Sequence, residues 1–216
     1  MAVRPGNFQQ NDTLNRYLLF FPRNANALND VHSFTGEEAL SQPYRYTIRF
    51  TSPNANIPPD AILNQKAEFL LRAPNPEASW HGQSSWLPVR QINGTITAFS
   101  RVKSSSDEAL YECVLEHELA LLNRNFRSAV YTDVTVPEVV TQLMKESRYF
   151  EGFNIDFDSL RCTYPRREMI IQWKETDLEF IRRLLAEVGI WFRLENHSTT
   201  PTETVVIFGC LLYTSD

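Results

Sequence analysis

The strongest pattern of apolar and polar positions in the chain lies in the segment Tyr164–Leu194. Within it, apolar residues recur every three or four positions, as on the buried face of a helix: Leu178, Ile181, Leu185 and Val188. Thr176 precedes this run, and Glu179 stands three residues after Thr176, which is the spacing of a capping box. Gly189 stands where a helix ends in a left-handed turn. The pattern predicts a capped helix near residues 177–188.

Strands are predicted on both sides of this helix. A β-type run of apolar residues precedes it: Met169, Ile170, Ile171 and Trp173. After the helix, the segment Ile190–Leu194 alternates between apolar and polar positions, as a half-buried strand does. The unit predicted here is therefore strand, capped helix, strand.

A second helix is predicted near residues 136–147. Thr135 and Glu138 repeat the capping-box spacing, and Pro137 lies in the first turn, where its missing N–H costs nothing. The segments 153–157 and 204–208 read as further strands. We therefore expect residues 124–209 to form a small α+β layer in the order helix, strand, strand, helix, strand, strand.

The first half of the chain has the period of β-strands. Tyr44–Phe50 alternates cleanly, with Tyr44, Tyr46, Ile48 and Phe50 on one face. Further strands are expected at 16–21, 67–71, 88–101 and 109–122, the last in preference to a helix. Gly94, isolated within a strand, indicates a bulge or a close backbone approach. The fold class predicted is mainly β with α+β: an antiparallel β-barrel over residues 1–123, followed by the α+β layer with its two helices.

Composition excludes some classes of protein. The net charge of -5 argues against a nucleic-acid binder, which needs a basic surface. The chain has no apolar run long enough to span a bilayer and no signal peptide at its N-terminus. Its cysteines are few, odd in number and far apart, which is typical of buried thiols in a reducing cytoplasm: Cys113, Cys162 and Cys210.

A search for reactive groups finds no convincing centre. The four histidines lack the spacing of metal ligands: His32, His81, His117 and His197. Ser84 near His81 has no acidic residue close in sequence, so we interpret it as a loop serine. We interpret Cys113 as a packed thiol. The sequence predicts no catalytic, cofactor-binding or metal-binding residue.

Two sets of charged residues are open to a binding interpretation. Asp156 and Asp158 have the spacing of a cation-binding pair, but apolar residues alternate with them, so the solvated face of a strand is the simpler interpretation. The pairs Arg166-Arg167 and Arg182-Arg183 have the charge to contact an acidic partner. We favour solvated ends of a strand and of a helix for both pairs.

Several blocks of residues occur in a specific order along the chain. They are Phe34-x-Gly36-x-Glu38 with Leu40-Ser41 and Tyr44-x-Tyr46, Arg90-x-Ile92-x-Gly94 with Ile96-Thr97-x-Phe99, Tyr111-Glu112-Cys113 with Leu119–Leu122, and finally the segment around the helix near residues 177–188. In this order, from Asn15 to Phe208, the chain resembles the VgrG family of type VI secretion spike proteins, whose N-terminal part is similar to the baseplate hub proteins of contractile phage tails.

The resemblance implies a structural component of a secretion spike, without enzymatic activity. It implies a homotrimer in the full-length protein, docking on the hexameric tube protein (Hcp), contact with baseplate and effector proteins, and delivery of effectors by puncturing target cells. It also implies assembly in the bacterial cytoplasm and secretion without a signal peptide. The alternatives are a phage tail baseplate hub (late control protein D) and, less favoured, a cell-wall hydrolase.

The last residues, 210–216, depart from the resembled family. Back-translation of CLLYTSD gives a sequence that resembles the transposon end used in sequencing adapters. We therefore expect residues 210–216 to be a non-native tail on an N-terminal fragment. The native genomic locus decides this, because an in-frame CLLYTSD there contradicts the hypothesis.

Overall fold

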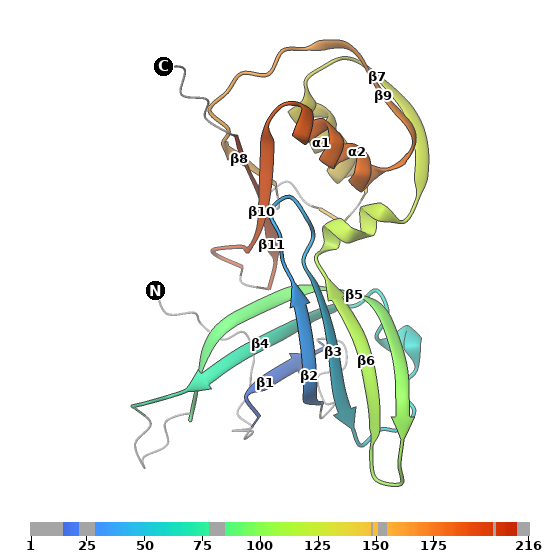
Figure 1. Ribbon diagram of the computed structural model, residues 1–216, viewed down its shortest axis with the longest axis vertical. Helices are drawn as coiled ribbons and strands as arrows, with labels where there is room; N and C mark the ends of the chain where they lie inside the picture. The colour runs from blue at the N-terminus through green and yellow to red at the C-terminus, as the bar shows by residue number, and fades with distance from the viewer. Residues whose placement is uncertain are drawn as a thin grey trace. The chain divides into compact units, whose positions relative to one another are not determined.

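The computed structural model describes residues 15–21, 29–77, 85–147, 149–150, 155–200 and 202–210. These residues form two compact units (Figure 1). The barrel unit takes its described residues from 1–37, 45–116 and 198–202, and the α+β unit from 38–44, 117–197 and 203–216. The protein is mainly β with an α+β part, as predicted. The expected division into domains at residue 123 stays a prediction.

The barrel unit is one curled antiparallel sheet of six strands, in the spatial order β1-β4-β5-β6-β3-β2. Its strands are β1 (Tyr17–Phe20), β2 (Asp30–Glu37), β3 (Arg45–Ser52), β4 (Lys66–Pro74), β5 (Trp86–Ser104) and β6 (Ala109–Glu116), with the short 3-10 helix η2 (Pro59–Ala61) before β4. In β3 the predicted alternation is confirmed, because Tyr46, Ile48 and Phe50 are buried and the residues between them are not.

Aromatic side chains hold the two edges of this sheet together. Among the described residues no backbone ladder joins β1 to β2. Instead the rings of Tyr17 and Phe34 meet edge to face with centroids 5.1 Å apart, and Phe34 meets Phe69 of β4 at 4.9 Å. The sheet is therefore a curled half-barrel, and side chains form the seam between its two edge strands.

Gly94 allows two strands to approach closely. A Cβ atom at this position would lie 2.3 Å from the backbone oxygen of Glu116, so only glycine fits. Ala67 pairs with Gly94 in regular register, and the irregularities in β5 lie elsewhere, at Val89 before it and beyond Ile96 after it. Of the two predicted roles, the close backbone approach is the correct one.

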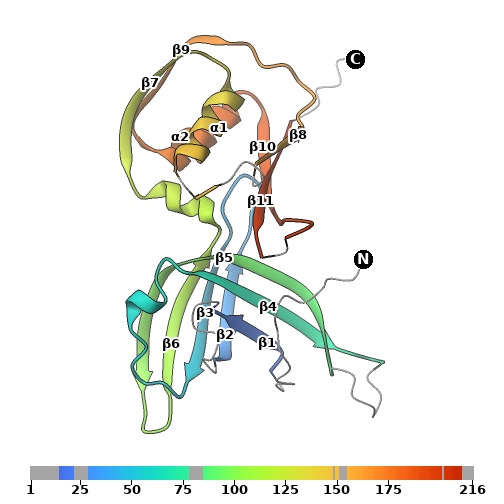
Figure 2. The ribbon, with the colours of Figure 1, turned by 180° about the vertical axis from the view of Figure 1, so that it is seen from behind.

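The α+β unit packs two helices between two small sheets, as both views show (Figures 1 and 2). One sheet has the order β10-β11-β8, and the other is a ribbon of β7 and β9. The elements are η3 (Glu118–Asn123), β7 (Phe126–Val134), α1 (Val136–Glu146), β8 (Ile155–Ser159), β9 (Arg167–Thr176), α2 (Asp177–Glu187), β10 (Ile190–Asn196) and β11 (Thr204–Cys210). Leu143, Phe180 and Leu184 lie at the centre of this core.

Both predicted capping boxes are present. Thr135 and Thr176 each accept a hydrogen bond from the backbone N–H three residues on, over 3.3 and 3.2 Å. Glu138 and Glu179 accept the reciprocal bond at 2.9 Å in both cases. After α2, Gly189 has a φ of 68°, in the left-handed region where it was expected.

Two expectations about strands require correction, and one strand was missed. The strand predicted to run to Leu122 ends at Glu116, because the His117 side chain accepts a bond from Leu119 N–H and starts η3. Strand β7 precedes α1 and was not predicted. The last strand, expected to end at Phe208, continues to Cys210.

Candidate functional site

The histidines and the paired aspartates do not converge on a site. Within the described segments, no group of three or more His, Cys, Asp or Glu side chains is placed to hold a metal ion. His117 is fully buried at the start of η3, whereas His32 is exposed on β2. Asp158 is exposed at the end of β8 and donates its N–H to Asp156 Oδ1 at 2.8 Å, a local turn contact. Ser84 and His81 lie outside the described residues.

The cysteines divide into one that was predicted correctly and two that were not. Cys113 is fully buried, and burial, with a contribution from Glu112, raises its thiol pKa to about 12, so it is a packed thiol and not a nucleophile. Cys162 is exposed and Cys210 half-buried, so the expectation of buried thiols is wrong for both. Their Sγ atoms lie 3.3 Å apart, although the two residues are far apart in sequence.

Three of the four paired arginines bind carboxylates of this same protein. Arg166 binds Asp133 at 3.0 Å and Glu138 at 2.9 Å, and Arg167 binds Glu187 at 2.7 Å. Arg183 binds Glu175 at 2.6 Å and Glu187 at 2.9 Å. The interpretation of these arginines as simple solvated ends is therefore incomplete.

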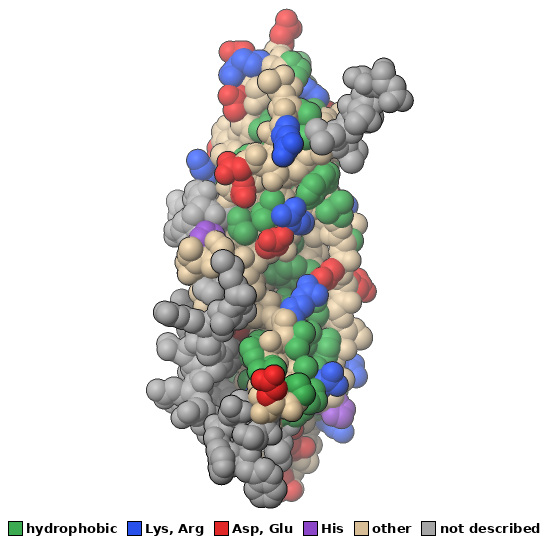
Figure 3. Space-filling model, turned by 90° about the vertical axis from the view of Figure 1, so that its left-hand side faces the viewer, with side chains coloured by type: hydrophobic (Ala, Val, Ile, Leu, Met, Phe, Trp, Pro, Cys, Tyr) green, Lys and Arg blue, Asp and Glu red, His purple; other side chains and the backbone are tan. Residues whose placement is uncertain are grey.

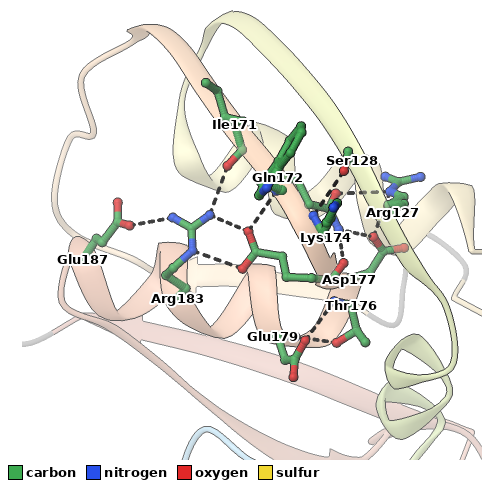
Figure 4. A network of polar contacts seen from close by, with 12 residues as sticks. Arg127, Ser128, Ile171, Gln172, Lys174, Thr176, Asp177, Glu179, Arg183 and Glu187 are labelled. Carbon is green, nitrogen blue, oxygen red and sulfur yellow. Dashed lines mark hydrogen bonds and ion pairs between the residues drawn. The ribbon is translucent and has the colours of Figure 1, made fainter.

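A network of polar contacts fixes strand β9 to helix α2 (Figure 4). Arg183 of α2 donates from Nη2 to the backbone oxygen of Ile171 over 3.0 Å. Its other contacts with Glu175 hold the pKa of that carboxyl below its ordinary value. Glu175 in turn accepts the backbone N–H of Trp173 at 3.4 Å. Two backbone groups on the free edge of β9 are thus occupied by side chains of the same unit.

The second part of the network joins β7 to α2. Arg127 Nε lies 2.8 Å from Asp177 Oδ1, at the first residue of α2. Gln172, fully buried on β9, donates to the same carboxylate oxygen at 2.8 Å and accepts from Arg127 at 3.2 Å. Because the acidic group lies at the positive end of the helix dipole, these contacts also stabilise the start of α2.

The outer face of the β7–β9 ribbon is apolar and exposed. We call it the ribbon face, and define it by five side chains with their exposed fractions: Phe126 (72%), Val130 (60%), Met169 (57%), Ile171 (44%) and Trp173 (67%). Val130 and Ile171 are directly opposite each other in the register. Charged side chains are interspersed with hydrophobic ones on the side of the molecule seen in Figure 3, which is the left-hand side of Figure 1.

Together these features describe a surface suited to binding. The polar network joins the ribbon to α2 on its inner side. An exposed apolar face with charge at its ends is typical of protein–protein contacts. Sequence reasoning missed it because β7 was not predicted, although the apolar run at Met169–Ile171 was visible.

Comparison with known proteins gives a consistent result. Residues 37–209 match the family model described as phage tail baseplate hub (GPD). The type VI secretion system spike protein VgrG5 of Pseudomonas aeruginosa is 31% identical over 184 residues, which are 83% of this chain and 20% of that protein. The actin cross-linking toxin VgrG1 of Vibrio cholerae is 27% identical over 74% of this chain and 14% of the toxin. The chain spans about a fifth or less of these relatives.

Solved structures show the same fold. An Escherichia coli component of the type VI secretion system, c3393, described as similar to bacteriophage tail proteins, superposes with a TM-score of 0.76 at 36% identity. The match covers 89% of this chain and 49% of that one. The Francisella PdpA–VgrG complex gives a TM-score of 0.59 at 10% identity, covering 87% of this chain and 28% of that one, which shows a shared fold alone.

Proposed function

The chain belongs to the phage tail baseplate hub (GPD) family, and on that basis we propose that it forms part of the hub of a type VI secretion spike. In this role it is a structural component that assembles in several copies at the tip of a contractile tube. The work it does is mechanical, since it transmits the thrust of the contracting sheath to the needle.

One observation carries the proposal. The family match spans both compact units, and a component of the type VI secretion system retains 36% identity and the fold over 89% of the chain. Identity at this level over two units is greater than a shared fold alone requires, because the fold persists in relatives at about a tenth identity. The secretion spike is therefore favoured over the other hubs of this family.

The partners are part of the proposal. We propose a homotrimer in the full-length protein, docked on a hexameric tube of the Hcp type and in contact with baseplate and effector proteins. A relative solved as a PdpA–VgrG complex supports binding of a further protein to this family. Assembly in the bacterial cytoplasm, followed by secretion without a signal peptide, is the route that fits these partners.

We propose that this region performs no reaction of its own. Its buried thiol has a pKa of about 12, and the arginines and glutamates around α2 are engaged in holding the ribbon. The toxin activity in the name of the Vibrio relative belongs to that protein, of which this chain matches 14%. Clearing of peptidoglycan by the purified chain would overturn this part of the proposal in favour of a cell-wall hydrolase.

A chimera tests the function directly. Residues 15–209 of this chain replace the matching N-terminal region of the Pseudomonas spike protein, and release of the tube protein into the medium is measured. We expect secretion to be retained, and to be lost when the chimera carries Leu185→Asp, which disrupts the α+β core. A stable chimera that supports no tube release would contradict the proposal.

The alternative is a phage tail baseplate hub, which the family description itself names. The two roles share one fold, so the genes around the native locus distinguish them. Sheath and tube genes beside an ATPase for sheath disassembly favour secretion, whereas capsid genes favour a phage tail.

A further inference from the structure

The ribbon face differs from an ordinary solvated sheet surface. Antiparallel sheets with one wet face alternate between apolar and polar residues, but β9 is apolar on both sides at Met169, Ile170 and Ile171. Ile170 points to the helices and is buried, while its two neighbours are exposed. Strands that are apolar on both faces are typically covered on both faces, so the ribbon lacks a covering layer.

The size of the ribbon face is compatible with a specific interface. At the exposed fractions given above, the five residues present roughly 600 Å² of accessible surface. This lies at the upper end of the roughly 300–600 Å² of the largest patch on a typical monomer. It is about three quarters of the roughly 800 Å² that each partner contributes to a stable association.

The edge of β9 is closed, which leaves the face as the docking surface. A partner that adds a strand needs the free backbone groups of an edge. Here Arg183 occupies the oxygen of Ile171, and Glu175 occupies the N–H of Trp173. Contact with β9 is therefore made through side chains, face on.

The composition of the face indicates a permanent partner. At its centre the remaining outward positions are the neutral Ser128 and Thr132, and charge lies at its ends, where Glu168 is exposed and Lys174 lies 5.5 Å from the Trp173 ring centroid. Interfaces between copies of one chain are more apolar and poorer in charge at their centre than transient ones. A tube ring or an effector, which must associate and separate, fits such a face less well.

We infer that the ribbon face is covered by a second copy of this chain in the assembled hub. The inference rests on the proposed function, in which several copies form the hub, and adds the surface that joins them. Val130 and Ile171 lie at the centre of the contact, with Phe126 and Trp173 towards one end and Met169 towards the other.

Sedimentation velocity of the full chain over a range of concentrations, with matched valine variants, tests the inference. We expect the chain to self-associate weakly, since the relatives extend far beyond it. Val130→Asp should raise the dissociation constant at least tenfold. Val89→Asp is the matched control, because Val89 is 67% exposed on strand β5 of the barrel unit. It should leave the dissociation constant within twofold.

A second variant and a fluorescence-quenching measurement distinguish a loss of association from a loss of folding. Val130→Thr retains strand propensity and removes only apolar surface, so it should weaken association in the same direction. Acrylamide quenching of Trp173, obtained as the difference from Trp173→Phe, should decrease as the chain associates. A monomeric chain at every concentration overturns the inference, as does association that Val130→Asp leaves unchanged or that Val89→Asp weakens equally.

The same variants separate this inference from the proposed function. Binding of a purified tube ring is measured beside self-association. Loss of tube binding in Val130→Asp with self-association intact assigns the face to the tube and overturns the inference. If self-association depends on Val130 but the chimera supports no secretion, the inference is retained and the secretion role is rejected.

Discussion

Arg183 Nη2 donates to the backbone oxygen of Ile171 across 3.0 Å, so a side chain of helix α2 closes the edge of strand β9. Trp173, two residues along the same edge, is closed in the same way by Glu175. Natural sheets protect their edges by several devices, of which charged side chains are one. In this protein the device also fixes the strand that carries most of the ribbon face.

Replacing Arg183 with Ala tests this closure. The side chain is partly exposed, so its ion pairs contribute little, and the charged hydrogen bond to the Ile171 oxygen is the larger loss. We expect a decrease of about 1–2 kcal/mol in the free energy of unfolding, measured by urea denaturation. Arg182→Ala, at the exposed neighbouring position, should change it by less than about 0.5 kcal/mol. Equal effects of the two substitutions would contradict the closure.

Leu185→Asp tests the predicted core face of α2. Leu185 is 1% exposed, and an unpaired carboxylate at this position costs several kcal/mol. We expect the α+β unit to lose its dispersed amide resonances in an NMR spectrum. Ala186→Asp, at the exposed next position, should fold normally. A soluble Leu185→Asp variant that melts cooperatively at the wild-type temperature would refute the placement of this residue.

The two capping threonines should differ in their contribution to stability. Both accept the backbone bond of a capping box, but the Thr176 hydroxyl also donates to Asn123 Oδ1 at 2.8 Å. Thr135→Ala should cost about 1 kcal/mol, which is typical of a lost N-cap. Thr176→Ala should cost about 2 kcal/mol, because Asn123 also loses its donor. A larger loss in Thr135→Ala, measured by denaturant unfolding, would rule out this ranking.

His117 should make stability depend on pH. Burial lowers its pKa from 6.5 to about 4, against a smaller opposite effect of Glu118, whose Oε2 lies 3.9 Å from Nε2. The rings of Tyr44 and Phe150 cover it, and its Nδ1 accepts the Leu119 N–H, so the proton of the neutral ring is on Nε2. The folded protein therefore binds the second proton more weakly than the unfolded chain does.

This stabilising contribution is complete above pH 6.5 and is lost as the pH falls towards 4. At pH 5 the loss is on the order of 2 kcal/mol. The carboxyl groups whose pKa is lowered, including Glu138 and Glu175, begin from 4.5, so they act mainly below pH 5. His117→Asn keeps a capping acceptor without the titrating ring, so its stability should be nearly constant between pH 5 and 7. The same slope in both proteins would exclude His117 as the cause.

Local signals made the helices and the clean strands predictable. The capping boxes at Thr135 and Thr176 depend on contacts three residues apart, and they form as the sequence indicates. Strand β3 has a strict alternation, because one of its faces lines the barrel interior. In these elements the local preference and the tertiary packing agree.

The missed elements are those in which tertiary contacts decide. In β7 the inward row of Arg127, Ala129 and Tyr131 mixes charged with apolar residues, so the strand has no alternating pattern. The segment 118–123 consists largely of helix formers and follows the His117 cap, but the alternation of the residues before it favoured a strand in the prediction. Leu119 and Leu122 of the resulting 3-10 helix pack into the α+β core.

The candidate site was predictable only in part. The apolar run at Met169–Ile171 predicted the strand that the structure shows as β9. The bond from Arg183 to Ile171 depends on how α2 lies under the ribbon, which residue spacing does not specify. The proximity of Cys162 and Cys210 likewise follows from tertiary structure, in which β11 runs parallel to β8.

The seam between β1 and β2 has a mechanical consequence. Ladders of backbone hydrogen bonds join all the remaining neighbouring pairs of strands in the barrel unit. At the seam, the edges are joined by the rings of Tyr17 and Phe34. Rings slide past one another without breaking a directional bond, whereas a ladder must break as a row. In the proposed role as part of a spike hub, the barrel would yield first along this line under compression, widening or narrowing while its central strands stay in register.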